Sequence, residues 1–147
     1  MKKIGQAGFT LIELMVTVAI IVVLGGIAYP NYTAHLAKGK RSAAQSFMQA
    51  LASREEQQLL NTRCYFSYPT DTACTPPSNI VVPQEVSTNY TVTITAANTA
   101  GAPPTYTITG TPSGTQATKD AKCGTLTLTN TGVKGASGSS GGPACWR

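Results

Sequence analysis

Hydrophobic side chains fill one long stretch near the start of the chain. Twenty residues, from Phe9 to Ala28, are almost all Leu, Ile, Val, Met, Ala or Gly, and only Thr10, Glu13 and Thr17 interrupt them. At roughly 1.5 Å per residue, a helix of this length matches the hydrocarbon thickness of a bilayer. The stretch therefore predicts a membrane-spanning helix.

The pattern becomes amphipathic from Asn31 to about Leu60. Apolar residues recur on one side at helical spacing, namely Leu36, Ala43, Ala44, Phe47, Met48 and Leu51. The residues expected to face water or neighbours are Lys40, Gln45, Gln49, Arg54 and Glu56. No Gly or Pro occurs between Lys40 and Leu60, so the range from Phe9 to Leu60 is predicted to be one long helix.

One interruption of this helix is expected. Gly25, Gly26 and Pro30 lie close together, and proline removes a backbone donor and clashes with the preceding turn. A kink or a locally melted segment is therefore predicted near Val22 to Pro30.

Later in the chain, threonine alternates with apolar residues in three short segments, residues 89–95, 105–109 and 125–129. Such alternation describes half-buried antiparallel strands with threonine outward. Pro and Gly predict loops or turns in residues 64–86, 97–104 and 111–123, and the Gly- and Ser-rich residues 131–143 are expected to be flexible unless they are tied down. The predicted fold class is α+β. A long N-terminal helix packs against a small antiparallel sheet, because the sheet needs a second layer.

Glu13 is the residue of the apolar stretch that demands an explanation. A bare carboxylate at membrane depth is costly and needs a partner. Cleavage after Gly8 would remove a short basic leader with Lys2 and Lys3 and would create an α-amine on Phe9. That cation could pair with Glu13 of another copy of the chain.

Two simpler readings compete. A secretory signal peptide would have a shorter apolar core and a small-residue cleavage site, for which Ala19 or Gly25 would have to serve. A plain single-span anchor would account for the length of the stretch but not for Glu13 or Gly8.

The residues from Gly8 to Leu14, GFTLIEL, resemble the class III signal of type IV pilins and of type II secretion pseudopilins. The resemblance implies that a prepilin peptidase cuts after Gly8 and methylates Phe9, and that Glu13 pairs with the Phe9 amine of a neighbouring subunit. It also implies that Pro30 marks a stretch that loses helicity in the filament. The expected parts are a leader (1–8), a transmembrane or filament-core helix segment (9–30) and a globular pilin domain (31–147).

Four cysteines, Cys64, Cys74, Cys123 and Cys145, lie beyond the apolar stretch. An even count in an exported domain favours disulfides, and three connectivities are possible. Because the cysteines form two clusters along the sequence, we expect Cys64–Cys74 and Cys123–Cys145. No CxxC pair is present and His35 is distant in sequence, so neither a metal site nor a cofactor is expected.

The C-terminal region suggests a second resemblance. The phrase CGTLTL from Cys123, with Cys145 and Trp146, is most similar to PilE-type minor pilins and also resembles ComP-like pilins that bind DNA during uptake. The net charge is +5, or +3 without the leader, which permits contact with nucleic acid without requiring it. The residues proposed to contact DNA are Lys119, Lys122, Lys134, Arg147 and Trp146.

No catalytic constellation occurs in the sequence, so an enzyme is not expected. The expected function is that of a structural subunit, of minor type, in a type IV pilus that serves adhesion, twitching motility or DNA uptake. The expected partners are other pilin subunits, the inner membrane before assembly, a prepilin peptidase, the pilus assembly machinery and DNA. A pilus-borne DNA receptor and a type II secretion pseudopilin remain alternatives.

Overall fold

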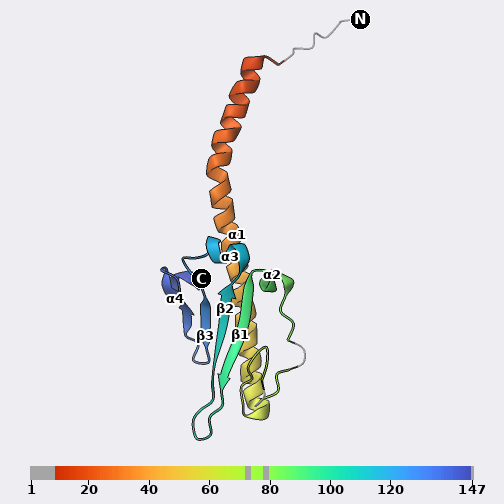
Figure 1. Cartoon of the computed structure of the whole chain (residues 1–147), viewed down its shortest axis with the longest axis vertical. Coiled ribbons are helices and arrows are strands. Elements are labelled where there is room, and N and C mark those ends of the chain that lie inside the picture. The colour runs from red at the N-terminus through yellow and green to blue at the C-terminus, as the bar shows by residue number, and fades with distance from the viewer. Residues whose placement is uncertain (1–8, 72–73, 78–79, 147) are drawn as a thin grey trace, which may run out of the picture. The chain divides into compact units, whose positions relative to one another are not determined.

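The computed structural model describes residues 9–71, 74–77 and 80–146 (Figure 1). The chain divides into two compact units, one up to His35 and one from Leu36 onward. The elements are α1 (Leu11–Thr62), α2 (Gln84–Ser87), β1 (Tyr90–Ala97), β2 (Thr105–Pro112), α3 (Gly114–Lys119), β3 (Leu126–Thr129), β4 (Lys134–Ala136) and α4 (Gly141–Cys145). The predicted α+β class, with a long N-terminal helix and an antiparallel sheet, is confirmed.

In the first unit, α1 is long and apolar enough to cross a membrane. Its large apolar side chains, from Leu11 to Tyr32, are exposed by half or more, so the unit itself does not cover them. Thr10 accepts a hydrogen bond from the Glu13 N–H through Oγ1 (3.3 Å), which satisfies one of the free donors at the start of the helix.

The helix continues through Pro30, so the locally melted segment expected near Val22 to Pro30 is absent from this structure. A proline removes one hydrogen bond, which is a small fraction of those in a helix of 52 residues. In the next turn, the Asn31 side-chain amide donates to the Ile27 carbonyl (3.2 Å).

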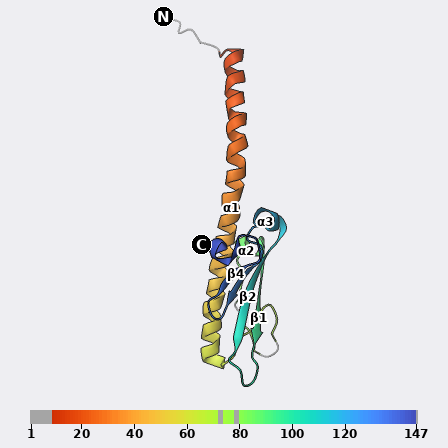
Figure 2. The same cartoon turned by 90° about the vertical axis from the view of Figure 1, so that its left-hand side faces the viewer.

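In the second unit, the residues of α1 from Leu36 onward cover one face of the sheet (Figure 2). Two assignments of the amphipathic face are wrong. Leu36 is 48% exposed, whereas Gln45, expected to face outward, is only 6% exposed. The buried stripe is rotated toward Ala37, because the sheet and the C-terminal segment supply polar partners for that side of the helix.

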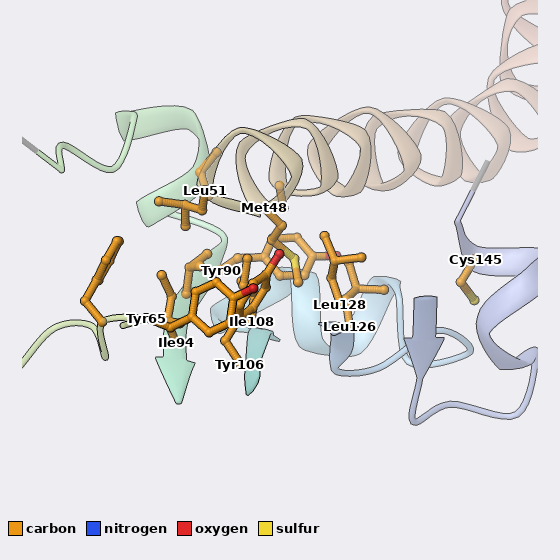
Figure 3. Close-up of a cluster of buried hydrophobic side chains, with 14 of the residues drawn as sticks. Met48, Leu51, Tyr65, Tyr90, Ile94, Tyr106, Ile108, Leu126, Leu128 and Cys145 are labelled. Carbon is orange, nitrogen blue, oxygen red and sulfur yellow. The ribbon is translucent and has the colours of Figure 1, made fainter. Parts of the chain in front are cut away.

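The sheet has the order β1-β2-β3-β4 with antiparallel neighbours. Ile94, Ile108 and Leu128 lie side by side in the register, and threonines alternate with them on the other face. Figure 3 shows Met48 and Leu51 of α1 above this inner face, with the apolar side chains of the sheet beneath them. The three predicted strands are therefore present.

The Gly- and Ser-rich tail is more ordered than its composition suggested. Residues 131–143, expected to be flexible unless tied down, include β4, which pairs with β3, and the start of α4. Two close backbone approaches explain why glycine occurs here. A Cβ at Gly138 would lie 2.2 Å from the Lys122 carbonyl oxygen, and one at Gly142 would lie 2.4 Å from that of Lys134. The short helix α3 likewise lies within a segment expected to be a loop or turn, and α2 begins in another such segment.

Candidate assembly segment and nucleic-acid interface

The candidate assembly residues lie in the first unit. Glu13 is in the first turn of α1 and is exposed, with apolar side chains on either side of it. Phe9 precedes the helix and is 79% exposed. Gly8, the expected cleavage position, and the rest of the leader lie outside the described residues, as does the side chain of Pro30. Exposed, this carboxylate is available to a cation on another chain.

All four cysteines are paired in the second unit. The disulfides are Cys64–Cys74, which closes the loop after α1, and Cys123–Cys145, which joins the turn after α3 to α4. These are the two pairs expected from the sequence clusters.

The first two candidate DNA contacts flank a buried carboxylate. Lys119 ends α3 and Lys122 follows in the next turn, and both are exposed. Asp120, between them, is buried and forms an ion pair with Arg41 of α1. Arg41 neutralises the charge of Asp120 within the protein, so this carboxylate does not offset the positive charges of the two lysines.

The other candidate contacts lie near the C-terminus. The Lys134 Nζ atom is 5.6 Å from the centre of the Trp146 ring, within the range of a cation–π contact. Trp146 donates through Nε1 to the Gly135 carbonyl (2.7 Å), so the ring is held against β4. Arg147 lies outside the described residues.

Backbone contacts join these two groups of residues. The N–H of Ser140 donates to the Lys122 carbonyl (2.9 Å), and that of Gly138 donates to the Cys123 carbonyl (2.9 Å). In both views, α3 and α4 lie toward the same end of the sheet, away from the β1–β2 hairpin (Figures 1 and 2). We call Lys119, Lys122, Lys134 and Trp146 the basic surface.

A buried polar network beneath α3 was not anticipated. The Tyr90 hydroxyl donates to Asp120 Oδ2 (3.0 Å), and Gln116 Nε2 lies within 3.1 Å of the Tyr90 hydroxyl and donates to the Ala37 carbonyl (2.9 Å). Burial raises the pKa of the Tyr90 hydroxyl to about 12, so it remains a donor at neutral pH. The network joins residues up to 79 positions apart, and nothing in the local pattern indicates such partners.

Two aromatic residues of the loop after α1, Tyr65 and Phe66, pack on the sheet. Phe66 is fully buried, and the rings of Tyr65 and Tyr106 meet edge to face with centroids 4.7 Å apart. The Phe66 N–H donates to Glu55 Oε2 (3.2 Å), and burial raises the pKa of Glu55 to about 7. Within the described ranges, no group of three or more His, Cys, Asp or Glu residues could hold a metal ion.

Comparison with known families separates the chain into two matches. Residues 30–127 match the model of a family described as "Type IV minor pilin ComP, DNA uptake sequence receptor". Residues 4–29 match the "Prokaryotic N-terminal methylation motif", which covers the apolar stretch and the second part of the leader. The first match extends over more than half of the chain.

Individual relatives are similar mainly over shorter segments. A fimbrial protein of Moraxella nonliquefaciens is 41% identical over 61 residues, which are 42% of this chain and 40% of the relative. A fimbrial protein of Pseudomonas aeruginosa is 46% identical over 56 residues, 38% of this chain and 36% of the relative. The type IV major pilin protein PilA of Myxococcus xanthus (strain DK1622) is 47% identical over 49 residues, which are 33% of this chain and 22% of the relative.

The chain thus matches less than half the length of these relatives. The proteins that it resembles are structural subunits rather than enzymes. The fold and the two family matches agree, and the chain belongs to the type IV pilins, in the family described as minor pilin ComP, the DNA uptake sequence receptor.

Proposed function

We propose that this protein is a minor subunit of a type IV pilus and that its basic surface binds duplex DNA. The observation that carries the proposal is the match of residues 30–127 to a family described as a DNA uptake sequence receptor. The basic surface adds a physical reason, since it combines three exposed lysines with a partly buried tryptophan at one end of the sheet.

Assembly would follow from the first unit. The precursor is held in the inner membrane by the apolar half of α1, and a prepilin peptidase cuts after Gly8 and methylates Phe9. The pilus assembly machinery then moves the subunit from lipid into the filament. There, Glu13 meets the Phe9 amine of a neighbour, which supplies the opposite charge that a desolvated carboxylate needs.

Binding of DNA would begin with its phosphates. Each lysine that neutralises a phosphate releases counterions, so affinity depends steeply on salt. Trp146 offers a flat apolar face beside Lys134, which suits contact with sugar or base edges.

A salt titration tests the proposal. The mature full-length chain in detergent micelles is titrated with fluorescent duplex DNA at several salt concentrations. We expect the logarithm of the binding constant to fall linearly with the logarithm of the salt concentration, with a slope of roughly −0.9 per phosphate contact. The triple variant Lys119→Gln/Lys122→Gln/Lys134→Gln should lower this slope, while Lys38→Gln, an exposed lysine on α1, is the matched control.

Absence of binding near physiological salt would remove the DNA receptor from the proposal. The protein would then remain a pilus subunit for adhesion or twitching motility, which the amount of the chain in sheared surface filaments would test separately.

A further inference from the structure

We propose that Arg41 and Gln45 of α1 are positioning residues that fix the two halves of the basic surface relative to each other. The inference rests on the proposed binding of DNA by that surface. The first half consists of Lys119 and Lys122, and the second half consists of Lys134 and Trp146.

Arg41 holds the first half through Asp120. Its Nη1 atom donates to Asp120 Oδ1 and lies 3.0 Å from Cys123 Sγ. Asp120 lies between the two lysines in sequence and directly follows α3, and its backbone N–H donates to the Gln116 carbonyl (2.9 Å). The guanidinium group therefore anchors the short segment from which both lysines project.

Gln45 holds the second half through the main chain. Its Nε2 atom donates to the carbonyl oxygen of Cys145 (2.7 Å), the residue directly before Trp146. Gln45 is 6% exposed, so this hydrogen bond is shielded from solvent. Its loss would leave the Cys145 carbonyl without that partner. Trp146 in turn lies against Lys134 and bonds to Gly135.

The two anchors occupy adjacent turns of one helix. Residues four apart in an α-helix lie on the same face, about 5–6 Å from each other between Cβ atoms. A third contact, from Gln116 to the Ala37 carbonyl, extends the same face by one more turn. The Cys123–Cys145 disulfide joins the two halves at the points where Arg41 and Gln45 reach them.

This arrangement matters for DNA because phosphates are spaced regularly along each strand. A rigid spacing of lysines lets several phosphates be neutralised at once, and each adds to the salt dependence. Loosening one anchor would let one half of the basic surface move relative to the other half. The lysines would still be present, but fewer would act together.

The experiment uses Trp146, the only tryptophan of the chain, as a reporter of the second half. The mature full-length chain in detergent micelles carries Arg41→Gln, Gln45→Leu, or one of two controls, Gln49→Leu and Lys38→Gln. Both control residues are exposed on α1. Gln49→Leu repeats the change made at Gln45, and Lys38→Gln, like Arg41→Gln, replaces a cation by a neutral amide. Trp146 emission is recorded first, and duplex DNA is then titrated at several salt concentrations, at a temperature at which each variant is folded.

We expect Gln45→Leu to change the Trp146 emission, to weaken DNA binding about tenfold, which is the effect of one buried hydrogen bond, and to reduce the slope of log affinity against log salt. Arg41→Gln should reduce the slope of log affinity against log salt by about one, corresponding to one lost phosphate contact. A variant that merely unfolds in part loses affinity equally at every salt concentration, so its slope stays unchanged. Both controls should match the wild-type chain.

The proposal is overturned if Gln45→Leu keeps either the wild-type Trp146 emission or the wild-type slope. This variant leaves no unpaired charge buried, so it decides the question even if Arg41→Gln does not fold. If the wild-type chain fails to bind DNA, the proposed function fails, whereas the Trp146 emission still decides whether α1 positions the C-terminal segment.

Discussion

Glu55 is a fully buried carboxyl group on α1. Its Oε2 atom accepts the Phe66 N–H, but within the described part of the chain Oε1 has no hydrogen-bond partner. Burial is the largest cause of its raised pKa, about 7 instead of 4.5, and Asp71 and Glu56 add to it. The group thus changes its charge close to neutral pH, beneath a loop that is closed by a disulfide.

This pKa predicts a pH-dependent stability. Because the native state holds the proton more tightly than the unfolded chain, the contribution of Glu55 is full below about pH 4.5 and is lost as the pH rises through 7. Glu55→Gln should remove this loss and raise the free energy of unfolding at pH 8 by up to about 3 kcal/mol. Denaturant unfolding at pH 5 and pH 8 measures the difference, with exposed Glu85→Gln as the control.

A wild-type chain that is equally stable at pH 5 and pH 8 would contradict the raised pKa. So would a Glu55→Gln variant that retains the pH dependence of the wild-type chain.

At the scale of elements, the two disulfides fasten different parts of the second unit. Cys64–Cys74 closes a loop whose aromatic residues pack on the sheet. Cys123–Cys145 holds α4, and through it Trp146, against the turn that carries Lys122. The two disulfides have similar chemistry. Removing each one separately therefore distinguishes an effect on the stability of the fold from an effect on DNA binding.

We expect Cys64→Ser/Cys74→Ser and Cys123→Ser/Cys145→Ser each to lower the free energy of unfolding by about 2–4 kcal/mol. Only the second change should also lower the DNA affinity and its salt dependence, since only that bond joins the halves of the basic surface. Thermal unfolding and a salt titration of DNA binding measure the two effects. Equal loss of DNA affinity in both variants would show that binding follows overall stability alone.

At the scale of the whole molecule, the two units bury their apolar residues in different ways. The unit from Leu36 onward has its own core, formed by α1 and the inner face of the sheet. The unit up to His35 leaves its apolar side chains exposed, so they require lipid or the helices of other subunits. Such a surface suits a subunit that passes from a membrane to a filament.

Glu13 supplies the prediction at this scale. Glu13→Ala should remove the partner of the Phe9 amine and so reduce or disorder filament assembly, while insertion into the membrane persists because the change makes the stretch more apolar. Electron microscopy of sheared filaments and membrane fractionation measure the two effects. Thr17→Ala removes another polar group from the same stretch and should assemble normally. Abundant normal filaments from Glu13→Ala would refute the pairing.

Much of this protein could be predicted because it depends on local pattern. The apolar stretch, the helical periodicity after Asn31 and the threonine alternation each follow from a repeat within one segment. The cysteine clusters predicted the pairs that the structure contains, because each bond joins residues close in sequence. Three short elements, α2, α3 and β4, were not predicted because each is too short to show a clear periodicity of apolar residues.

The buried polar partners of α1 could not be predicted. Arg and Gln are residue types typical of a solvent-exposed helix face. Only the folded chain brings Asp120 to Arg41 and the Cys145 carbonyl to Gln45. A hydrogen bond between distant residues leaves no periodic trace in a single sequence.

The sequence by itself determined the two-part character of the chain: an apolar helix with one carboxylate, followed by an amphipathic helix and alternating strands. These features arise from interactions between neighbours along the chain, which a pattern records. The tertiary structure alone decided how the lysines and Trp146 are held together, because that depends on contacts across 79 to 100 positions. The physical reason is that burial of Arg41, Gln45 and Asp120 becomes favourable only when all their partners are in place.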